Sequence, residues 1–252
     1  MRGIVMTGPS VLALRNCVPG QWPAVPIDAA KPFKWQTRRL CNPQPAVDGW
    51  RITLEGKRPM RLPDGVVCSV FTTNDPAAMT EAMNCLPKPY RVGELLYVKE
   101  TWAPIWTEYE PDTEAGQTVW DVPHRVEYRA DTGARYPGGW PDDAGGDPAC
   151  ARWRSARYMP ERASRLTLRV MEVGAPERVQ SISEEDAKAE GLEYVPDGIH
   201  TACWRSPLLD YVWYRWGWAA FAALWDSLHG KDHLWASDPY VWPISLMVVE
   251  AK

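Results

Sequence analysis

The stretch Arg165-Leu-Thr-Leu-Arg-Val-Met-Glu-Val173 alternates apolar and polar residues over its whole length. Successive side chains of a strand point to opposite faces, so this alternation predicts a half-buried β-strand. Weaker patterns of the same kind predict further strands at Ile4–Thr7, Trp35–Leu40, Arg51–Leu54, Val66–Thr72, Glu94–Glu100, Val126–Ala130 and Tyr240–Glu250. Pro243 lies inside the last strand and indicates a sheet edge or a bulge there.

Three helices are expected between these strands. The first covers about Val11–Cys17, with Ser10 as its N-cap. The second covers Ser183–Gly191, with a capping-box pair of Ser183 and Asp186 and a terminal glycine suited to positive φ. The third spans about Leu208–His229, and we expect its four tryptophans in the core: Trp213, Trp216, Trp218 and Trp225. Many short strands with few helices predict an α+β fold built on a small barrel-like sheet.

The length of 252 residues fits one domain with insertions. We treat residues 1–252 as that single domain and expect insertions at about 18–33, 46–90 and 131–150. The chain contains 24 prolines, which implies many loops between the short elements.

Charge and cysteine usage narrow the class of protein. A net charge of −4 argues against a protein that coats nucleic acid by bulk electrostatics, although a local basic groove remains open. Six cysteines without a CxxC pair are typical of reduced thiols in a cytosol. The start lacks a secretory apolar region, and the apolar stretch 208–228 carries Asp210, Arg215 and Asp226, so we expect a cytoplasmic protein without a membrane partner.

Metal and cofactor motifs give no positive signal. His229 and His233 have the spacing of a metal pair, but Gly230 should break the helix that would align them. No glycine-rich phosphate loop or dinucleotide fingerprint is present in the sequence. We therefore expect no metal and no cofactor.

The segment Lys34-Trp-Gln-Thr37-Arg38-Arg39 is the first candidate for a site. In a strand, Thr37 and Arg39 would share one face, with Lys34 at its mouth. A threonine hydroxyl needs a nearby base to act as a nucleophile, and a lysine is a base only when its pKa is lowered. Arg38 and Arg39 would supply such a positive charge or bind a phosphate. The alternative interpretation is a surface strand with solvated cations.

The helix at 183–191 supplies the second candidate. Glu190 lies in its last turn, where the helix dipole disfavours a negative charge unless a cation faces it. Lys34 or an arginine would be a natural partner. The alternative is an acidic surface helix with well-chosen caps.

Six arginines lie within 18 residues and are interleaved with Trp153 and Tyr158: Arg152, Arg154, Arg157, Arg162, Arg165 and Arg169. Arginines beside aromatic rings suit phosphate contacts and base stacking. The alternative is that they neutralise the acidic segments 108–114 and 184–190. Trp35 and Trp102 lie near the polar motifs and are further stacking candidates.

Six blocks carry a resemblance to a known family: Lys34-Trp-Gln-Thr37-Arg38-Arg39, Val92-Gly-Glu-Leu-Leu-Tyr-Val-Lys-Glu-Thr-Trp102, Tyr128-Arg-Ala-Asp131, Ser164-Arg-Leu-Thr-Leu-Arg-Val170, Ile182-Ser-Glu-Glu-Asp-Ala-Lys-Ala-Glu-Gly191 and Pro239-Tyr-Val-Trp-Pro-Ile244. In these blocks the chain resembles ASCH-domain proteins of the PUA-like superfamily, in particular the large, Trp-rich members commonly encoded by bacteriophages and prophages. The resemblance implies a PUA-like β-barrel with a cleft for RNA or a modified nucleobase, in a bacterial host cytoplasm if the gene is phage-borne.

Some small bacterial members of that family remove the acetyl group from N4-acetylcytidine with a lysine, a threonine three residues later and a distant glutamate. By this resemblance the catalytic residues would be Lys34, Thr37 and Glu190. Substrate-binding residues would be Arg39, Arg38, Trp35, Glu100, Trp102, Arg154 and Arg157. The partner would be a modified nucleoside or RNA.

Three functions follow from these observations. The first is an amidohydrolase acting on an acylated cytidine, with Thr37 as nucleophile, Lys34 as base and Arg39 at the oxyanion. The second is a non-catalytic module that binds RNA or a modified nucleobase in the same cleft. The third is a ribonuclease that uses the arginine-rich segment to hold the backbone.

Overall fold

The computed structural model describes residues 1–29, 31–42, 45–48, 51–54, 71–72, 88–105, 125–132, 152–195, 203–206, 209, 212–229 and 233–252. Its helices are α1 (Gly8–Arg15), α3 (Arg129–Thr132), α4 (Glu184–Ala189) and α5 (Gly217–Leu228). Its strands are β1 (Arg2–Val5), β2 (Gln36–Leu40), β3 (Pro45–Asp48), β4 (Arg51–Leu54), β5 (Phe71–Thr72), β6 (Leu95–Lys99), β7 (Trp102–Ile105), β8 (Arg125–Tyr128), β9 (Leu166–Val173), β10 (Glu177–Arg178), β11 (Glu193–Tyr194), β12 (Trp204–Arg205) and β13 (Tyr240–Ala251).

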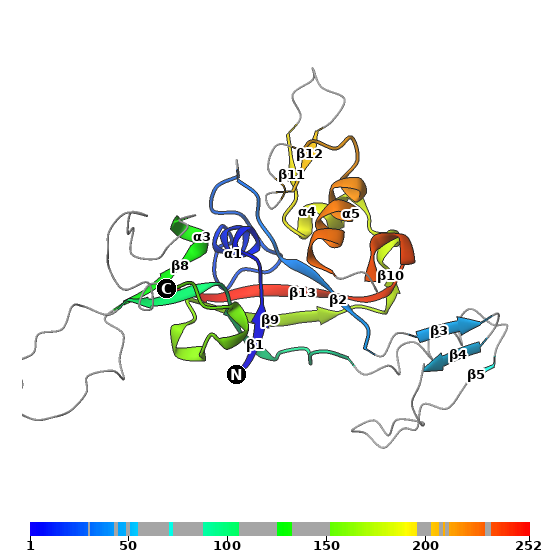
Figure 1. The fold of residues 1–252 in the computed structure, drawn as a ribbon, viewed down its shortest axis with the longest axis horizontal. Helices are drawn as coiled ribbons and strands as arrows, with labels where there is room; N and C mark the ends of the chain where they lie inside the picture. Colours follow the sequence, from blue (N-terminus) through cyan, green and yellow to red (C-terminus); the bar gives the residue numbers. More distant parts are fainter. Residues whose placement is uncertain are drawn as a thin grey trace, which may run out of the picture.

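The largest sheet is built around β13, which runs through the middle of the molecule (Figure 1). Ile244 pairs with Val173 of β9 on one side and with Thr37 of β2 on the other. β10 continues on the β9 side, β6 follows β9, and β1 lies parallel to β6 at the far end. The other pairings within this sheet are antiparallel.

This sheet curls so that its two ends approach each other. Arg39 extends from β2, at one end of the strand order, and its Nη2 donates a 2.8 Å hydrogen bond to the carbonyl of Val5 in β1, at the other end. The result is a curled half-barrel. The prediction of an α+β fold with a small barrel-like sheet is confirmed at this level.

Two apolar clusters lie against the sheet. In the first, Val11 and Leu14 of α1 pack with the inward residues of the strands, among them Leu168, Ile244 and Leu246. In the second, α4 and α5 pack through Ala187, Phe221 and Trp225, with Val179 and Val241. Figure 1 shows α1 and the α4–α5 pair above β13.

Most strand predictions hold within one or two residues. The long strand expected at 165–173 is β9, whose buried residues alternate with more exposed ones along most of its length. Arg51–Leu54 is β4, and it forms a separate three-stranded sheet with β3 and β5. Part of the expected insertion at 131–150 lies outside the described residues, and Asp131 and Thr132 close the short helix α3.

The first helix begins earlier than predicted. Thr7, not Ser10, is the N-cap, because its hydroxyl accepts the backbone hydrogen bond of Ser10 at 3.3 Å. Pro9 then occupies the first turn, where its missing N–H costs no hydrogen bond.

The third helix is shorter than predicted, because α5 begins only at Gly217. Tyr214 instead forms a β-bridge with Trp204, with reciprocal backbone hydrogen bonds of 2.8 and 2.7 Å. Of the four tryptophans expected in the core, only Trp225 is buried. The other three are more than 40% exposed: Trp213, Trp216 and Trp218. Local pairing has therefore overridden the helical pattern here.

Pro243 does not mark a sheet edge, because β13 has partners on both sides. It lies where β9 has ended and β10 has not yet begun, so the missing N–H is not needed on that side. Gly174 fills this gap, and a Cβ at that position would lie 2.8 Å from the Pro243 ring. The register of β13 with β9 shifts between Ser245 and Leu246, two residues further along the strand.

No helix in the described part of the chain is long and apolar enough to span a membrane.

Candidate functional site

The site forms where α4 ends beside the segment that leads into β2. Gly191 has φ of +89°, and the amides of Gly191 and Leu192 bond to the carbonyls of Lys188 and Ala187, which closes the helix in a Schellman motif. The amide of Trp35 then donates to the Ala189 carbonyl at 3.1 Å. These backbone contacts place Lys34 directly against the C-terminus of α4.

Lys34 and Glu190 form a buried ion pair. The Lys34 ammonium lies 2.6 Å from Glu190 Oε2 and 2.9 Å from the Glu190 backbone carbonyl. The two residues are only 3% and 6% exposed. The ammonium therefore compensates both the carboxylate and the negative end of the helix. This offsets the electrostatic cost of placing Glu190 at a helix C-terminus.

Arg38 completes a network on the same carboxylate. Its Nη1 lies 3.4 Å from Glu190 Oε1, while Nη2 lies 2.9 Å from Glu177 and 3.0 Å from Asp186. The guanidinium carbon stands 5.9 Å from the centre of the Phe221 ring. Arg38 is thus a buried structural cation at this helix end, and the surface-strand interpretation of this segment is wrong for Lys34 and Arg38.

Burial lowers the pKa of Lys34 from its ordinary value of 10.5, and the charges of Arg39 and Arg38 lower it further. Glu190 opposes this shift through its charge and its hydrogen bond. For Arg38 burial acts to lower the pKa, but Glu190, Glu177 and Asp186 outweigh it and raise the pKa. The environment therefore favours a lysine that gives up its proton more easily than a solvated one.

Thr37 and Arg39 lie on the face of β2 opposite to Arg38, since side chains alternate along a strand. Thr37 is 6% exposed, and its hydroxyl makes no hydrogen bond within the described residues. Arg39 binds the Val5 carbonyl through Nη2, but its Nε is buried without a partner among the residues that the structure covers. Burial lowers the pKa of Arg39. A hydroxyl and an N–H donor that both lack a partner among the described residues, on one face of a strand, suit a ligand with an acceptor atom.

The predicted substrate-binding residues do not all gather here. Trp35 is partly buried and stacks on Phe33, with 5.2 Å between ring centres. Arg154 and Arg157 are exposed on a different segment of the surface. Arg154 stands over the ring of Trp102, which is buried and whose Nε1 has no hydrogen-bond partner among the residues that the structure describes.

Glu100 belongs to a second buried ion cluster. Arg165 holds both of its oxygens, at 2.8 and 2.7 Å, and also pairs with Asp131. Asp131 in turn binds Arg15 of α1 at 2.9 Å, and the Tyr128 ring lies under the Arg165 guanidinium at 4.1 Å. These are the contacts of a structural pair, and Arg165 is therefore buried, unlike the other five arginines between residues 152 and 169.

Sequence reasoning missed Glu177 and the second role of Asp186. Asp186 was identified only as a capping residue, and it does accept the Ser183 amide. Glu177 lies in the two-residue strand β10, which has no sequence pattern of its own. The available signal was Arg38 itself. A buried arginine needs acidic partners, so its burial would have indicated that carboxylates such as Glu177 lie close to it.

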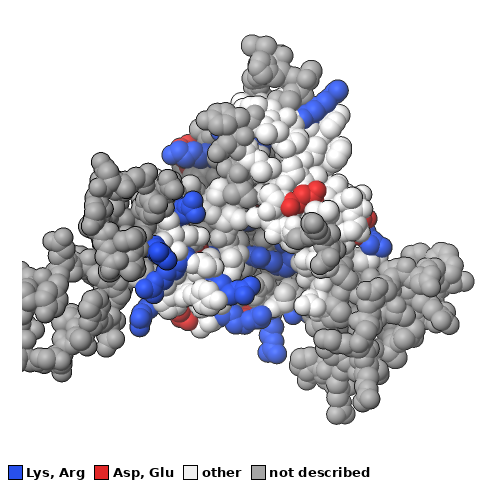
Figure 2. All heavy atoms as spheres, viewed as in Figure 1, with Lys and Arg blue, Asp and Glu red and all other residues white. Residues whose placement is uncertain are grey.

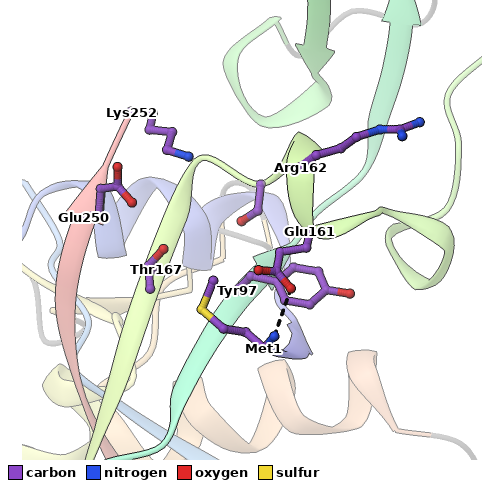
Figure 3. Close-up of a pocket in the computed structure, with 8 residues that line it drawn as sticks. Met1, Tyr97, Glu161, Arg162, Thr167, Glu250 and Lys252 are labelled. Carbon is purple, nitrogen blue, oxygen red and sulfur yellow. Dashed lines mark hydrogen bonds and ion pairs between the residues drawn. The ribbon is translucent and has the colours of Figure 1, made fainter. Parts of the chain in front are cut away.

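A separate cavity of about 390 Å³ opens beside the ends of β9 and β13 (Figure 3). Tyr97, Ser164 and Thr167 line it, together with charged groups of both signs. The amine of Met1 bonds to Glu161 there at 2.9 Å, while the Arg162 guanidinium extends away from the hollow. None of the predicted site residues lines this cavity.

Among the described residues, no three His, Cys, Asp or Glu side chains form a group able to hold a metal ion. Comparison of the chain with protein-family models, curated proteins and solved structures gave no significant match.

Proposed function

We propose that this protein is an amidohydrolase that removes an acyl group from the exocyclic amine of a modified cytidine. The observation that carries the proposal is the buried Lys34–Glu190 pair, whose members are 156 residues apart in sequence. Beside it runs β2, in which the Thr37 hydroxyl has no hydrogen bond to any described residue. The substrate class comes from the resemblance to ASCH-domain proteins and to their PUA-like fold.

The first step would begin with transfer of the Lys34 proton to Glu190, which leaves a neutral amine. Both groups are then uncharged, which burial favours. The amine accepts the Thr37 hydroxyl proton as the Thr37 oxygen attacks the amide carbon. The negative charge that develops on the amide oxygen would be met by Arg39, whose buried Nε lacks a partner in the described part of the chain.

The tetrahedral intermediate would then collapse, breaking the C–N bond. Lys34 returns the proton to the leaving amine, and an acyl ester remains on Thr37. Water hydrolyses this ester with Lys34 again as base, which releases the acid and restores the threonine. Arg38, held by three carboxylates, would fix Glu190 and help to keep the pKa of Lys34 low.

The test is incubation of the purified protein with N4-acetylcytidine, followed by chromatographic detection of cytidine. Thr37→Val keeps the shape of the side chain without the hydroxyl and should abolish product. Lys34→Met should lower kcat/KM by about 10²- to 10⁴-fold. Thr167→Val and Lys99→Met are matched controls outside the site and should retain activity.

Circular dichroism of each variant would separate loss of chemistry from loss of folding. The absence of cytidine at high protein concentration would remove the proposal. Full activity in folded Thr37→Val would remove Thr37 as the nucleophile.

One observation favours a second candidate, a module that binds the nucleobase without turnover. Lys34 directs its hydrogen bonds to Glu190, and no hydrogen bond joins it to Thr37 in the described residues. In that case calorimetry would detect binding of the nucleoside, Arg39→Met would weaken it, and the nucleoside would be recovered intact.

A further inference from the structure

The segment Arg152–Arg162 presents an exposed basic surface outside the Lys34 site. Two short 3-10 turns, η2 (Ala156–Tyr158) and η3 (Glu161–Ala163), bury Ala156, Met159 and Ala163. Met159 and Ala163 pack against Trp102, which turns the intervening side chains outward. The exposed side chains form what we call the basic surface: Arg152, Arg154, Arg157, Tyr158 and Arg162.

The backbone of this surface is held firmly. Arg154 and Trp102 exchange two backbone hydrogen bonds, at 2.7 and 3.3 Å. Lys99 donates to the carbonyl of Arg157 at 2.9 Å. Ser155 caps η2 through its side chain. The arginines are therefore presented from a fixed scaffold, which lowers the entropic cost of binding a partner.

The four arginines have no carboxylate partner within the described residues. Glu161, the one acidic residue between them, pairs with the amine of Met1. Three acidic residues of α4 and its C-cap, which were proposed alternative partners, are engaged elsewhere, since Glu190 binds Lys34, Asp186 binds Arg38 and Glu184 binds the Gly217 amide. The exposed Glu185 forms no ion pair with the four arginines in the described part of the chain. The positive charge of the basic surface is therefore not compensated by α4.

Figure 2 shows Lys and Arg side chains gathered over the lower left of this face, with few Asp or Glu among them. The same part of Figure 1 holds β1 and the segment that carries η2 and η3. This concentration contrasts with the overall net charge of −4. It is a local field that attracts a polyanion.

Tyr158 adds an aromatic element to this field. It is 74% exposed, although burial of its ring would be favourable, and Arg157 precedes it directly. An exposed ring among arginines that have no carboxylate partner in the described ranges suits a strand whose phosphates bind guanidinium groups and whose unpaired base stacks on the ring. An acidic protein segment would use the arginines but would leave the ring unexplained.

We infer that the basic surface binds single-stranded nucleic acid, with phosphates on Arg152, Arg154, Arg157 and Arg162 and one base stacked on Tyr158. The inference goes beyond the proposed function because it uses none of the residues around Lys34 and requires no turnover. If both hold, the acylated cytidine is presented within a strand.

The test is fluorescence anisotropy with labelled 12-nucleotide single strands of RNA and DNA, between 50 and 200 mM salt. Four phosphate contacts predict a slope of log K against log salt of about −3. The double substitution Arg157→Gln, Arg162→Gln should weaken binding and reduce the size of this slope by about 1.4. Tyr158→Ala should weaken binding by about 5-fold to 150-fold, the range measured for loss of one stacked base.

Arg215→Gln is the matched control, because Arg215 is also an exposed arginine, stacked over Trp216 at 5.0 Å beside α5. It should bind like the unmodified protein, and so should Thr37→Val, which separates this inference from the hydrolytic proposal. The absence of binding at 50 mM salt would overturn the inference. So would equal loss in the Arg215 control, or equally tight binding of a polyglutamate peptide that depends on the same arginines.

Discussion

Lys34 and Glu190 are each more than nine-tenths buried, so each charge depends on the other in place of water. Glu190→Gln keeps the shape of the side chain but leaves the ammonium beside Arg38 and Arg39 without its carboxylate. We expect this change to lower the free energy of unfolding by about 3–5 kcal/mol, measured by urea denaturation followed by tryptophan fluorescence. The double substitution Lys34→Met, Glu190→Gln should recover much of the loss, and Glu185→Gln on the exposed face of α4 should cost little.

The same substitution should change the dependence of stability on pH. Loss of Glu190 removes the group that opposes the lowering of the Lys34 pKa. Between that lowered pKa and the ordinary value of 10.5, the unfolded chain binds one more proton than the folded protein, so stability rises with pH. The destabilisation by Glu190→Gln should therefore be smaller at pH 9 than at pH 7 in denaturation measurements. A destabilisation that grows with pH would contradict the assignment.

Burial raises the pKa of the Cys41 thiol to about 12 from an ordinary value of 9.0. The folded protein keeps this proton after the unfolded chain has lost it, so Cys41 contributes a fall in stability as pH rises above 9.0. We also expect Cys41 to resist iodoacetamide at pH 8, while the partly exposed Cys203 reacts first. Peptide mass spectrometry would compare the two sites, with protein in urea as the control in which both react.

At the scale of the element, α4 owes its position to its two ends. Its N-terminus has a full capping box of Ser183 and Asp186, as the sequence predicts, so Ser183→Ala should cost about 1 kcal/mol. Gly191 closes the helix at positive φ, and a Cβ there would lie 3.3 Å from the Lys34 Cβ and 3.4 Å from the Ala13 Cβ.

Gly191→Ala should therefore destabilise by more than the about 1–2 kcal/mol that a left-handed conformation costs an L-residue. Gly20→Ala is the matched control, because Gly20 has φ of +74° and open space around it. Thermal denaturation of both variants would measure how much of the destabilisation comes from the close contacts of the added Cβ and how much from the left-handed backbone. Equal losses would show that the contact with Lys34 carries no cost.

The two ends of α4 were predictable because capping depends on neighbours in sequence. The start of α5 was not, because Tyr214 pairs with Trp204, and this β-bridge takes the preceding residues out of the helix. The apolar pattern at 208–216 carries no sign of that partner. Of the two alternatives that Pro243 indicated, the sheet edge was wrong for a similar reason, since the break between β9 and β10 that accommodates it lies elsewhere in the chain. The other alternative, a bulge, agrees with the register shift between Ser245 and Leu246.

At the scale of the whole molecule, the pairing of Lys34 with Glu190 was anticipated from chemistry, since a carboxylate at a helix C-terminus needs a cation. The engagement of Glu100 by Arg165 was not, because both residues lie at the ends of segments that the sequence predicts as ordinary strands, just outside β6 and β9. Sequence patterns indicate which side chains turn inward. They do not tell which of several arginines meets which carboxylate.

Arg39 also acts at the scale of the whole molecule, because its hydrogen bond to Val5 joins the two ends of the curled sheet. Arg39→Met keeps the apolar stem but removes the hydrogen bond to Val5, which is worth about 1.5–3 kcal/mol for a charged donor. We expect faster amide hydrogen exchange in β1, by about 10-fold or more, with little change in β9. Unchanged exchange in β1 would show that the end strand is held by β6 alone.

The central place of β13 governs when the molecule takes shape during synthesis. A ribosome must pass residue 251 before the strand that joins β2 to β9 is complete. Until then β1, β6 and β9 can pair with one another, but β2, which follows Lys34, lacks the strand that it pairs with in this sheet. A nascent chain arrested shortly before residue 240 should consequently be cut by proteases at β2 and at the segment that holds Lys34, whereas a released chain that includes residues 240–251 should resist cleavage there.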